Sequence, residues 1–134
     1  MDQMVFVNLP VKDLEVSKAF FTALGYRINP QFTDENAACV VISESIFTML
    51  ITEPFFKQFT KKEIADATRT TEVLVCLSAE SREAVDHLVD TALASGGSPA
   101  NETQEQGPMY GRSFQDPDGH IWEVMWMDPA AIQG

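Results

Sequence analysis

The chain has 134 residues, a length that suits one domain or two small modules that share a core. Hydrophobic residues make up 45% and charged residues 22%, which excludes a disordered or fibrous chain. Nine basic and 20 acidic side chains give a formal charge of -11, the wrong sign for a surface that binds phosphates. We therefore expect no nucleic-acid partner, whereas a cationic small molecule is electrostatically favoured.

Membrane insertion and secretion are not indicated by the sequence. No apolar run approaches the roughly 20 residues that a membrane-spanning helix needs. Residues 1–4 are acidic and lack the features of a signal peptide, so we expect a cytoplasmic location and no membrane partner. Cys39 and Cys76 each lie in an apolar run, which favours two reduced thiols in the core.

The first half of the chain predicts a strand, a helix and three further strands. Apolar side chains alternate over 5–11, and Asp13 is a suitable N-cap for an amphipathic helix over 14–24 that stops at Gly25. Three strand-like runs follow, with polar turns between them, at 26–32, 37–43 and 46–52. These elements give module one, 1–55, the order βαβββ.

Residues 56–71 interrupt this regularity and are predicted to be a connection with a short helix. Module two, 72–128, then repeats the order of module one. Its elements are a strand over 72–77, a helix over 79–95, and strands over 98–101, 109–115 and 120–127. Asp116-Pro117-Asp118-Gly119 joins the last two strands as a tight turn.

The two copies lie roughly 65 residues apart and resemble each other in pattern more than in identity. Each copy exposes one apolar sheet face, so the two must pair with each other or with a second chain. The predicted fold class is α+β, with two βαβββ modules that form an eight-stranded, cup-shaped sheet.

Three segments carry a resemblance to a known family. They are 6–14 (FVNLPVKDL) with Ser17, Phe20 and Phe21, then 24–26 (LGY), and finally 114–124 (FQDPDGHIWEV). In combination they resemble the vicinal oxygen chelate superfamily, which includes glyoxalase I, extradiol dioxygenases, fosfomycin-resistance enzymes and bleomycin-resistance proteins. The resemblance covers almost the whole chain and implies one domain of this family over 1–134.

The resemblance also implies a divalent metal inside the cup, with ligands on the first strand of each module and on a last strand. Glu123 occupies the last-strand position, on the face opposite Trp122, and Glu72 occupies the start of module two. Both are candidate metal ligands, and a solvated position near a strand end is the alternative for each. The remaining position holds Phe6, which has no donor atom for a metal.

Histidine does not replace the missing ligand in this reading. His87 lies on the outer side of a helix, and His120 points to the face opposite Glu123. Two carboxylates without an imidazole suit zinc, iron or nickel poorly, while magnesium or manganese stays chemically open. We therefore expect no cofactor, with a divalent metal as the alternative. Without a metal, the carboxylates need a counter-ion, for which Arg112 is the candidate, with a surface position as its alternative.

Three functions follow, and whether the protein is an enzyme stays open. The first is small-molecule binding in the cup without a full metal site, with the ligand-binding residues Phe6, Asn8, Tyr110 and Arg112. The second is a divergent metal-dependent lyase or ring-cleaving dioxygenase that uses Glu72 and Glu123. The third is a structural or regulatory dimer without turnover. A homodimer is expected, because modules of this family pair across chains and a short chain gains buried area that way.

Overall fold

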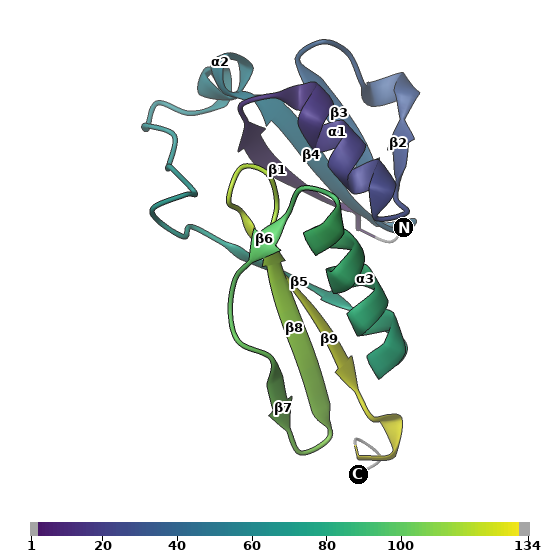
Figure 1. Cartoon of the computed structure of the whole chain (residues 1–134). Helices are drawn as coiled ribbons and strands as arrows, with labels where there is room; N and C mark the ends of the chain where they lie inside the picture. The colour runs from purple at the N-terminus through teal and green to yellow at the C-terminus, as the bar shows by residue number, and fades with distance from the viewer. Residues whose placement is uncertain (1–2, 132–134) are drawn as a thin grey trace. The chain divides into compact units, whose positions relative to one another are not determined.

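Each half of the chain builds one sheet with one long helix on it, as the computed structural model shows for residues 3–131 (Figure 1). The two units are Met1–Asp66 and Ala67–Gly134. Their boundary lies inside the segment 56–71, which the sequence assigns to the connection.

The first unit contains a four-stranded sheet in the order β1-β4-β3-β2. β1 and β4 are parallel, and the other neighbours are antiparallel. The elements are β1 (Val5–Val11), α1 (Leu14–Ala23), β2 (Arg27–Asn29), η1 (Pro30–Phe32), β3 (Ala37–Val41), β4 (Ile46–Thr52), α2 (Glu53–Phe56) and η2 (Lys57–Phe59). The strand predicted over 26–32 is shorter than expected, because Pro30 starts a 3-10 helix.

Helix α1 begins where the sequence predicts. The Asp13 carboxylate accepts the main-chain N–H groups of Glu15 and Val16, at 3.1 and 3.2 Å. Phe20 and Phe21 of the helix are 1% exposed and pack edge to face with each other. The core of this unit also includes one face of the sheet, whose most buried side chains are Leu9, Val11, Ala38, Val40, Thr48 and Leu50.

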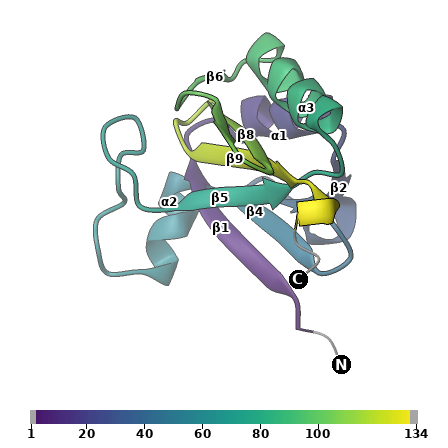
Figure 2. The same ribbon diagram turned by 90° about the horizontal axis from the view of Figure 1, so that it is seen from below.

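The second unit contains a sheet in the order β5-β9-β8-β6, with β7 paired to β8. β5 and β9 are parallel, and the other pairs are antiparallel. The elements are β5 (Leu74–Ser78), α3 (Arg82–Ala94), β6 (Ser98–Pro99), β7 (Gln104–Gln106), β8 (Met109–Gln115), β9 (Ile121–Met127) and η3 (Pro129–Ala131). Helix α3 contacts β8 and β9 on one face of the sheet (Figure 2).

Several predicted bounds of the second unit change; the strand predicted over 98–101, for example, ends at Pro99. The strand predicted from residue 72 starts at Leu74, and the helix predicted from residue 79 starts after its N-cap, Ser81, whose Oγ accepts the Ala84 N–H at 3.0 Å. Strand β7 is not predicted at all. Its three residues are polar and exposed, so they leave no hydrophobic alternation in the sequence.

The turn between β8 and β9 is organised by a buried carboxylate. Asp116 is 4% exposed; its Oδ1 accepts the N–H groups of Asp118 and His120 at 3.0 Å, and its Oδ2 accepts the Trp122 indole N–H at 3.1 Å. Gly119 has a φ of +94°, and a Cβ there would lie 2.9 Å from the Ala67 carbonyl oxygen. Only glycine fits this position without strain.

The α+β class and the two βαβββ-like modules with mixed sheets are confirmed. That the two sheets form a common eight-stranded cup stays a prediction. Within residues 3–131, no helix has the length and apolar composition to span a membrane.

Candidate functional site

Strand β9 places Glu123 on the open face of the second sheet, opposite α3. Trp122 and Val124 are 1% and 0% exposed on the helix side, whereas Glu123 and Met125 are partly exposed on the other. This confirms the face predicted for Glu123. Strand register sets its neighbours, since Glu123 pairs with Cys76 on β5 and with Ser113 on β8.

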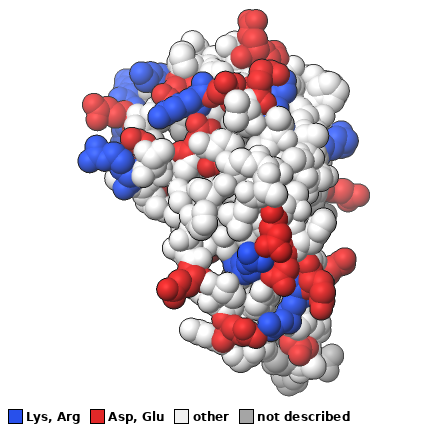
Figure 3. All heavy atoms as spheres, viewed as in Figure 1, with Lys and Arg blue, Asp and Glu red and all other residues white. Residues whose placement is uncertain are grey.

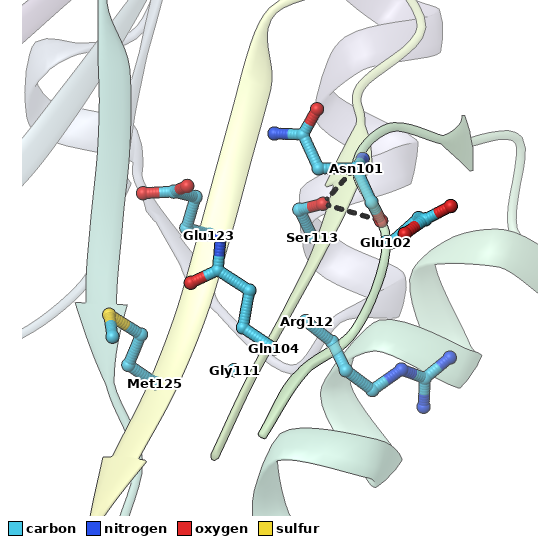
Figure 4. Close-up of a pocket in the computed structure, with 8 residues that line it drawn as sticks. All are labelled: Asn101, Glu102, Gln104, Gly111, Arg112, Ser113, Glu123 and Met125. Atoms are coloured by element: carbon cyan, nitrogen blue, oxygen red, sulfur yellow. Dashed lines mark hydrogen bonds between the residues drawn. The ribbon is translucent and has the colours of Figure 1, made fainter. Parts of the chain in front are cut away.

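A small pocket lies on this face beside Glu123 (Figure 4). It is lined by Asn101, Glu102, Gln104, Gly111, Arg112, Ser113, Glu123 and Met125. The Gln104 side chain extends toward β9, between Glu123 and Met125. The pocket volume of about 20 Å³ suits a water molecule rather than an organic ligand.

The pocket edge is fixed by reciprocal hydrogen bonds between Asn101 and Ser113. The Asn101 N–H donates to Ser113 Oγ at 2.8 Å, and the Ser113 hydroxyl donates to the Asn101 carbonyl at 3.3 Å. Ser113 is buried, so its hydroxyl is satisfied by this partner. The polar residues of the pocket lining are two amides, one hydroxyl, two carboxylates and one arginine: Asn101, Gln104, Ser113, Glu102, Glu123 and Arg112.

Glu72 lies outside the strand that pairs with β9. It lies before the first residue of β5 and four residues ahead of Cys76, the strand partner of Glu123. Because Glu72 lies in a bend ahead of β5, the strand register does not set its distance from Glu123. The role of either carboxylate as a metal ligand stays a prediction.

Cys76 faces Glu123 and is exposed, so its assignment to the core is wrong, whereas Cys39 is buried as predicted. Partial burial and the Glu123 charge raise the pKa of the Cys76 thiol. Cys76 is therefore protonated at neutral pH and is a weak nucleophile.

Tyr110 and Arg112 project toward α3, on the side opposite Glu123. The Tyr110 hydroxyl donates to Asp86 Oδ1 at 2.6 Å, and Arg112 Nη1 lies 2.9 Å from the same oxygen and 3.0 Å from Asp90 Oδ1. Arg112 is thus the counter-ion of carboxylates on α3 rather than of Glu123, and Figure 4 shows its side chain directed away from Glu123. A ligand contact by Tyr110 or Arg112 stays a prediction.

The same cluster continues to β7 through Arg82. Its guanidinium lies 4.1 Å from the centre of the Tyr110 ring, and its Nη2 lies 2.7 Å from Glu105 Oε1. Hydrogen bonds from Tyr110 and Arg112 lower the pKa of Asp86, and the bond to Asp86 together with burial raises the pKa of Tyr110. Over α3 and β8, basic side chains lie among acidic ones (Figure 3).

Sequence reasoning missed this cluster. The available signal was the spacing of Asp86 and Asp90, which places two carboxylates on adjacent turns of the predicted helix. No sequence pattern indicates that this helix face packs against the strand that carries Arg112.

Phe6 and Asn8 share the open face of the first sheet, as the alternation predicts. Phe6 stacks on Phe47, its strand partner on β4, with ring centres 4.7 Å apart and an interplanar angle of 11°. Phe6 is 47% exposed, and Asn8, paired with Met49, is also exposed. The first-strand position that the resemblance assigns to a metal ligand is therefore occupied by Phe6, which stacks on Phe47.

The donor set does not fit the metal that the resemblance implies. Across residues 3–131, no three side chains of His, Cys, Asp or Glu are grouped closely enough to hold an ion. Phe6 and Phe47 offer no donor, and the Glu123 side chain has Cys76 and Ser113 as its strand neighbours.

Comparisons with known proteins agree with the fold. Residues 3–43 match a family model described as bleomycin resistance protein-like N-terminal. A hypothetical protein from S. aureus has a similar structure, with a TM-score of 0.78 and 32% identity over 94% of this chain and 95% of that one. No curated protein matches the sequence significantly.

Two further solved structures share the fold at lower identity. A glyoxalase/bleomycin resistance protein/dioxygenase family enzyme from Burkholderia phytofirmans PsJN has a TM-score of 0.77 and 16% identity, over 94% of this chain and 99% of that one. A glyoxalase/bleomycin resistance protein from Albidiferax ferrireducens T118 has a TM-score of 0.68 and 24% identity, over 92% and 97%.

Proposed function

The chain belongs to the glyoxalase/bleomycin resistance/dioxygenase superfamily, and from this premise we propose that it binds a small molecule on its open sheet faces without a complete metal site. The observation that carries the proposal is the stack of Phe6 on Phe47 at a position where the family resemblance implies a metal ligand. An aromatic pair favours sequestration of a ligand over Lewis-acid chemistry.

The chemistry of the faces indicates the class of ligand. The exposed ring of Phe6 presents a flat apolar surface, and Asn8 on the same face supplies a hydrogen-bonding amide. The formal charge of -11 favours a cation over an anion. We therefore expect a planar, apolar molecule that carries a positive charge.

A homodimer is part of this proposal. β1 and β5 are each the terminal strand of their sheet in the described chain, and both carry exposed apolar side chains: Val5, Phe6 and Leu74 are 48%, 47% and 50% exposed. Such edges are usually covered or paired in the native assembly. Sedimentation at tens of micromolar, an order-of-magnitude concentration for moderate affinity, should show a dimer, and a single 14.9 kDa species would contradict this part.

The ligand proposal is tested by thermal denaturation with a panel of planar aromatic amines and their uncharged analogues. A ligand at a hundredfold excess over its Kd adds about 2.7 kcal/mol, which raises the Tm of a chain of this size by about 10 °C. Phe6→Ala should abolish the shift. Phe32→Ala is the matched control, because Phe32 is also exposed, at 58%, but lies in η1 rather than on the open face. Equal shifts in both variants would refute the assignment of Phe6.

Metal analysis distinguishes this proposal from a metal-dependent lyase or dioxygenase. Protein purified without chelator should contain transition metal far below one equivalent. One equivalent that is lost in Glu123→Ala would overturn the metal-free proposal and favour the enzyme.

A further inference from the structure

We propose that residues 101–107 form a flap over the Glu123 pocket, which the ion pair between Arg82 and Glu105 holds closed. This segment, called the flap below, contains β7 and supplies Asn101, Glu102 and Gln104 to the pocket lining. The ion pair is called the latch.

The flap is the movable wall of the pocket. The other lining residues belong to β8 and β9, which are paired along seven residues each. The pocket is partly open to solvent and has a volume of about 20 Å³, which suits one water molecule. Of its walls, β8 and β9 do not move apart without breaking their ladder, so the pocket enlarges through movement of the flap.

The contacts of the flap other than the latch hold it only weakly. All of its residues are exposed, and β7 pairs with β8 over three residues only. One end is tied by the hydrogen bonds between Asn101 and Ser113, and the other turns at Gly107, whose φ is +60°. Short pairing with exposed hydrogen bonds is typical of segments that open locally.

The latch connects the flap to a helix that is fixed in the core. Arg82 is the first residue of α3, in which Val85 and Val89 are 0% and 1% exposed. The Tyr110 ring and Glu105 together orient the Arg82 guanidinium. Because Arg82 and Glu105 are 45% and 57% exposed, salt screens their attraction. The latch is thus a weak and salt-sensitive restraint on the flap.

Hydrogen exchange tests the latch. Glu105→Gln should speed amide exchange in 104–106 by about two- to five-fold, the range expected for an exposed ion pair. Glu102→Gln is the matched control, since it removes the same charge from the same segment but from a side chain outside the latch. High salt should bring the wild type to the rate of Glu105→Gln. Equal rates in the wild type and Glu105→Gln, or equal acceleration in Glu102→Gln, would overturn the proposal.

Methionine oxidation tests whether the flap covers the pocket. Met125 lines the pocket, whereas Met127, two residues along the same strand, is 43% exposed and serves as an internal reference. With dilute hydrogen peroxide, the ratio of Met125 to Met127 oxidation should rise about twofold or more in Glu105→Gln. It should stay unchanged in Glu83→Gln, which removes an exposed carboxylate outside both the pocket lining and the latch. Faster exchange without this rise would show that the segment opens away from the pocket, and would overturn the proposal.

Discussion

Replacement of Asp116 by alanine should destabilise the fold strongly, although the residue lies in a turn. The change removes the carboxylate that accepts hydrogen bonds from three donors: the N–H groups of Asp118 and His120 and the indole N–H of Trp122. Trp122 is 1% exposed, so its N–H has no access to water. An orphaned buried donor costs about 1–3 kcal/mol, and the two amides add about 1 kcal/mol each. We expect a loss of about 3–5 kcal/mol.

Chemical denaturation of Asp116→Ala measures this loss, and a Tm lower by about 10–15 °C should accompany it. Trp122→Phe serves in a double-mutant cycle, because it removes the indole donor and should make the two changes less than additive by about 1 kcal/mol or more. A loss below about 0.5 kcal/mol in Asp116→Ala, or full additivity in the cycle, would refute the reasoning.

The pH dependence gives an independent check on the same residue. Burial raises the pKa of Asp116, so the folded protein takes up its proton at a higher pH than the unfolded chain, whose Asp pKa is about 3.9. The stability of the wild type relative to Asp116→Asn should therefore fall as the pH rises from about 4 through the raised pKa. A parallel pH dependence of the two proteins would contradict this assignment.

Three further changes probe separate parts of the fold. Gly119→Ala should cost about 2 kcal/mol or more in urea denaturation, because it adds a Cβ at positive φ against the Ala67 carbonyl; an unchanged midpoint would contradict the close approach. Asp13→Ala should cost about 1 kcal/mol through the lost N-cap of α1, seen as reduced protection of the first-turn amides. Asp86→Asn should cost less than about 1 kcal/mol above pH 5, and the difference should vanish as the pH falls below about 4, since hydrogen bonds lower the pKa of Asp86 in the fold.

The sequence was sufficient for the elements whose side chains alternate between a covered and an open face. The bounds predicted for 46–52 and 109–115 agree with β4 and β8, and the alternation in β9 placed Glu123 opposite Trp122 correctly. These positions depend on burial, which a periodic pattern records.

The candidate site depended on information that alternation does not contain. Parity alone put Glu72 and Glu123 on comparable faces, but the register of β5 against β9 sets Cys76 opposite Glu123. Register follows from long-range pairing between strands, which the alternation within one strand does not record. The contacts of Arg112 with α3 also depend on long-range packing, so they were not predictable from the sequence.

The parallel pairing of β1 with β4, and of β5 with β9, has a consequence for synthesis of the protein. In both units the first strand pairs only with the last one, β1 with β4 and β5 with β9. Each sheet is therefore completed only after its last strand has been synthesised. The first unit has its full set of strands once Thr52 has left the ribosome, while the second must wait for Met127. The two units thus complete their sheets in succession, and until β9 emerges β5 lacks its parallel partner.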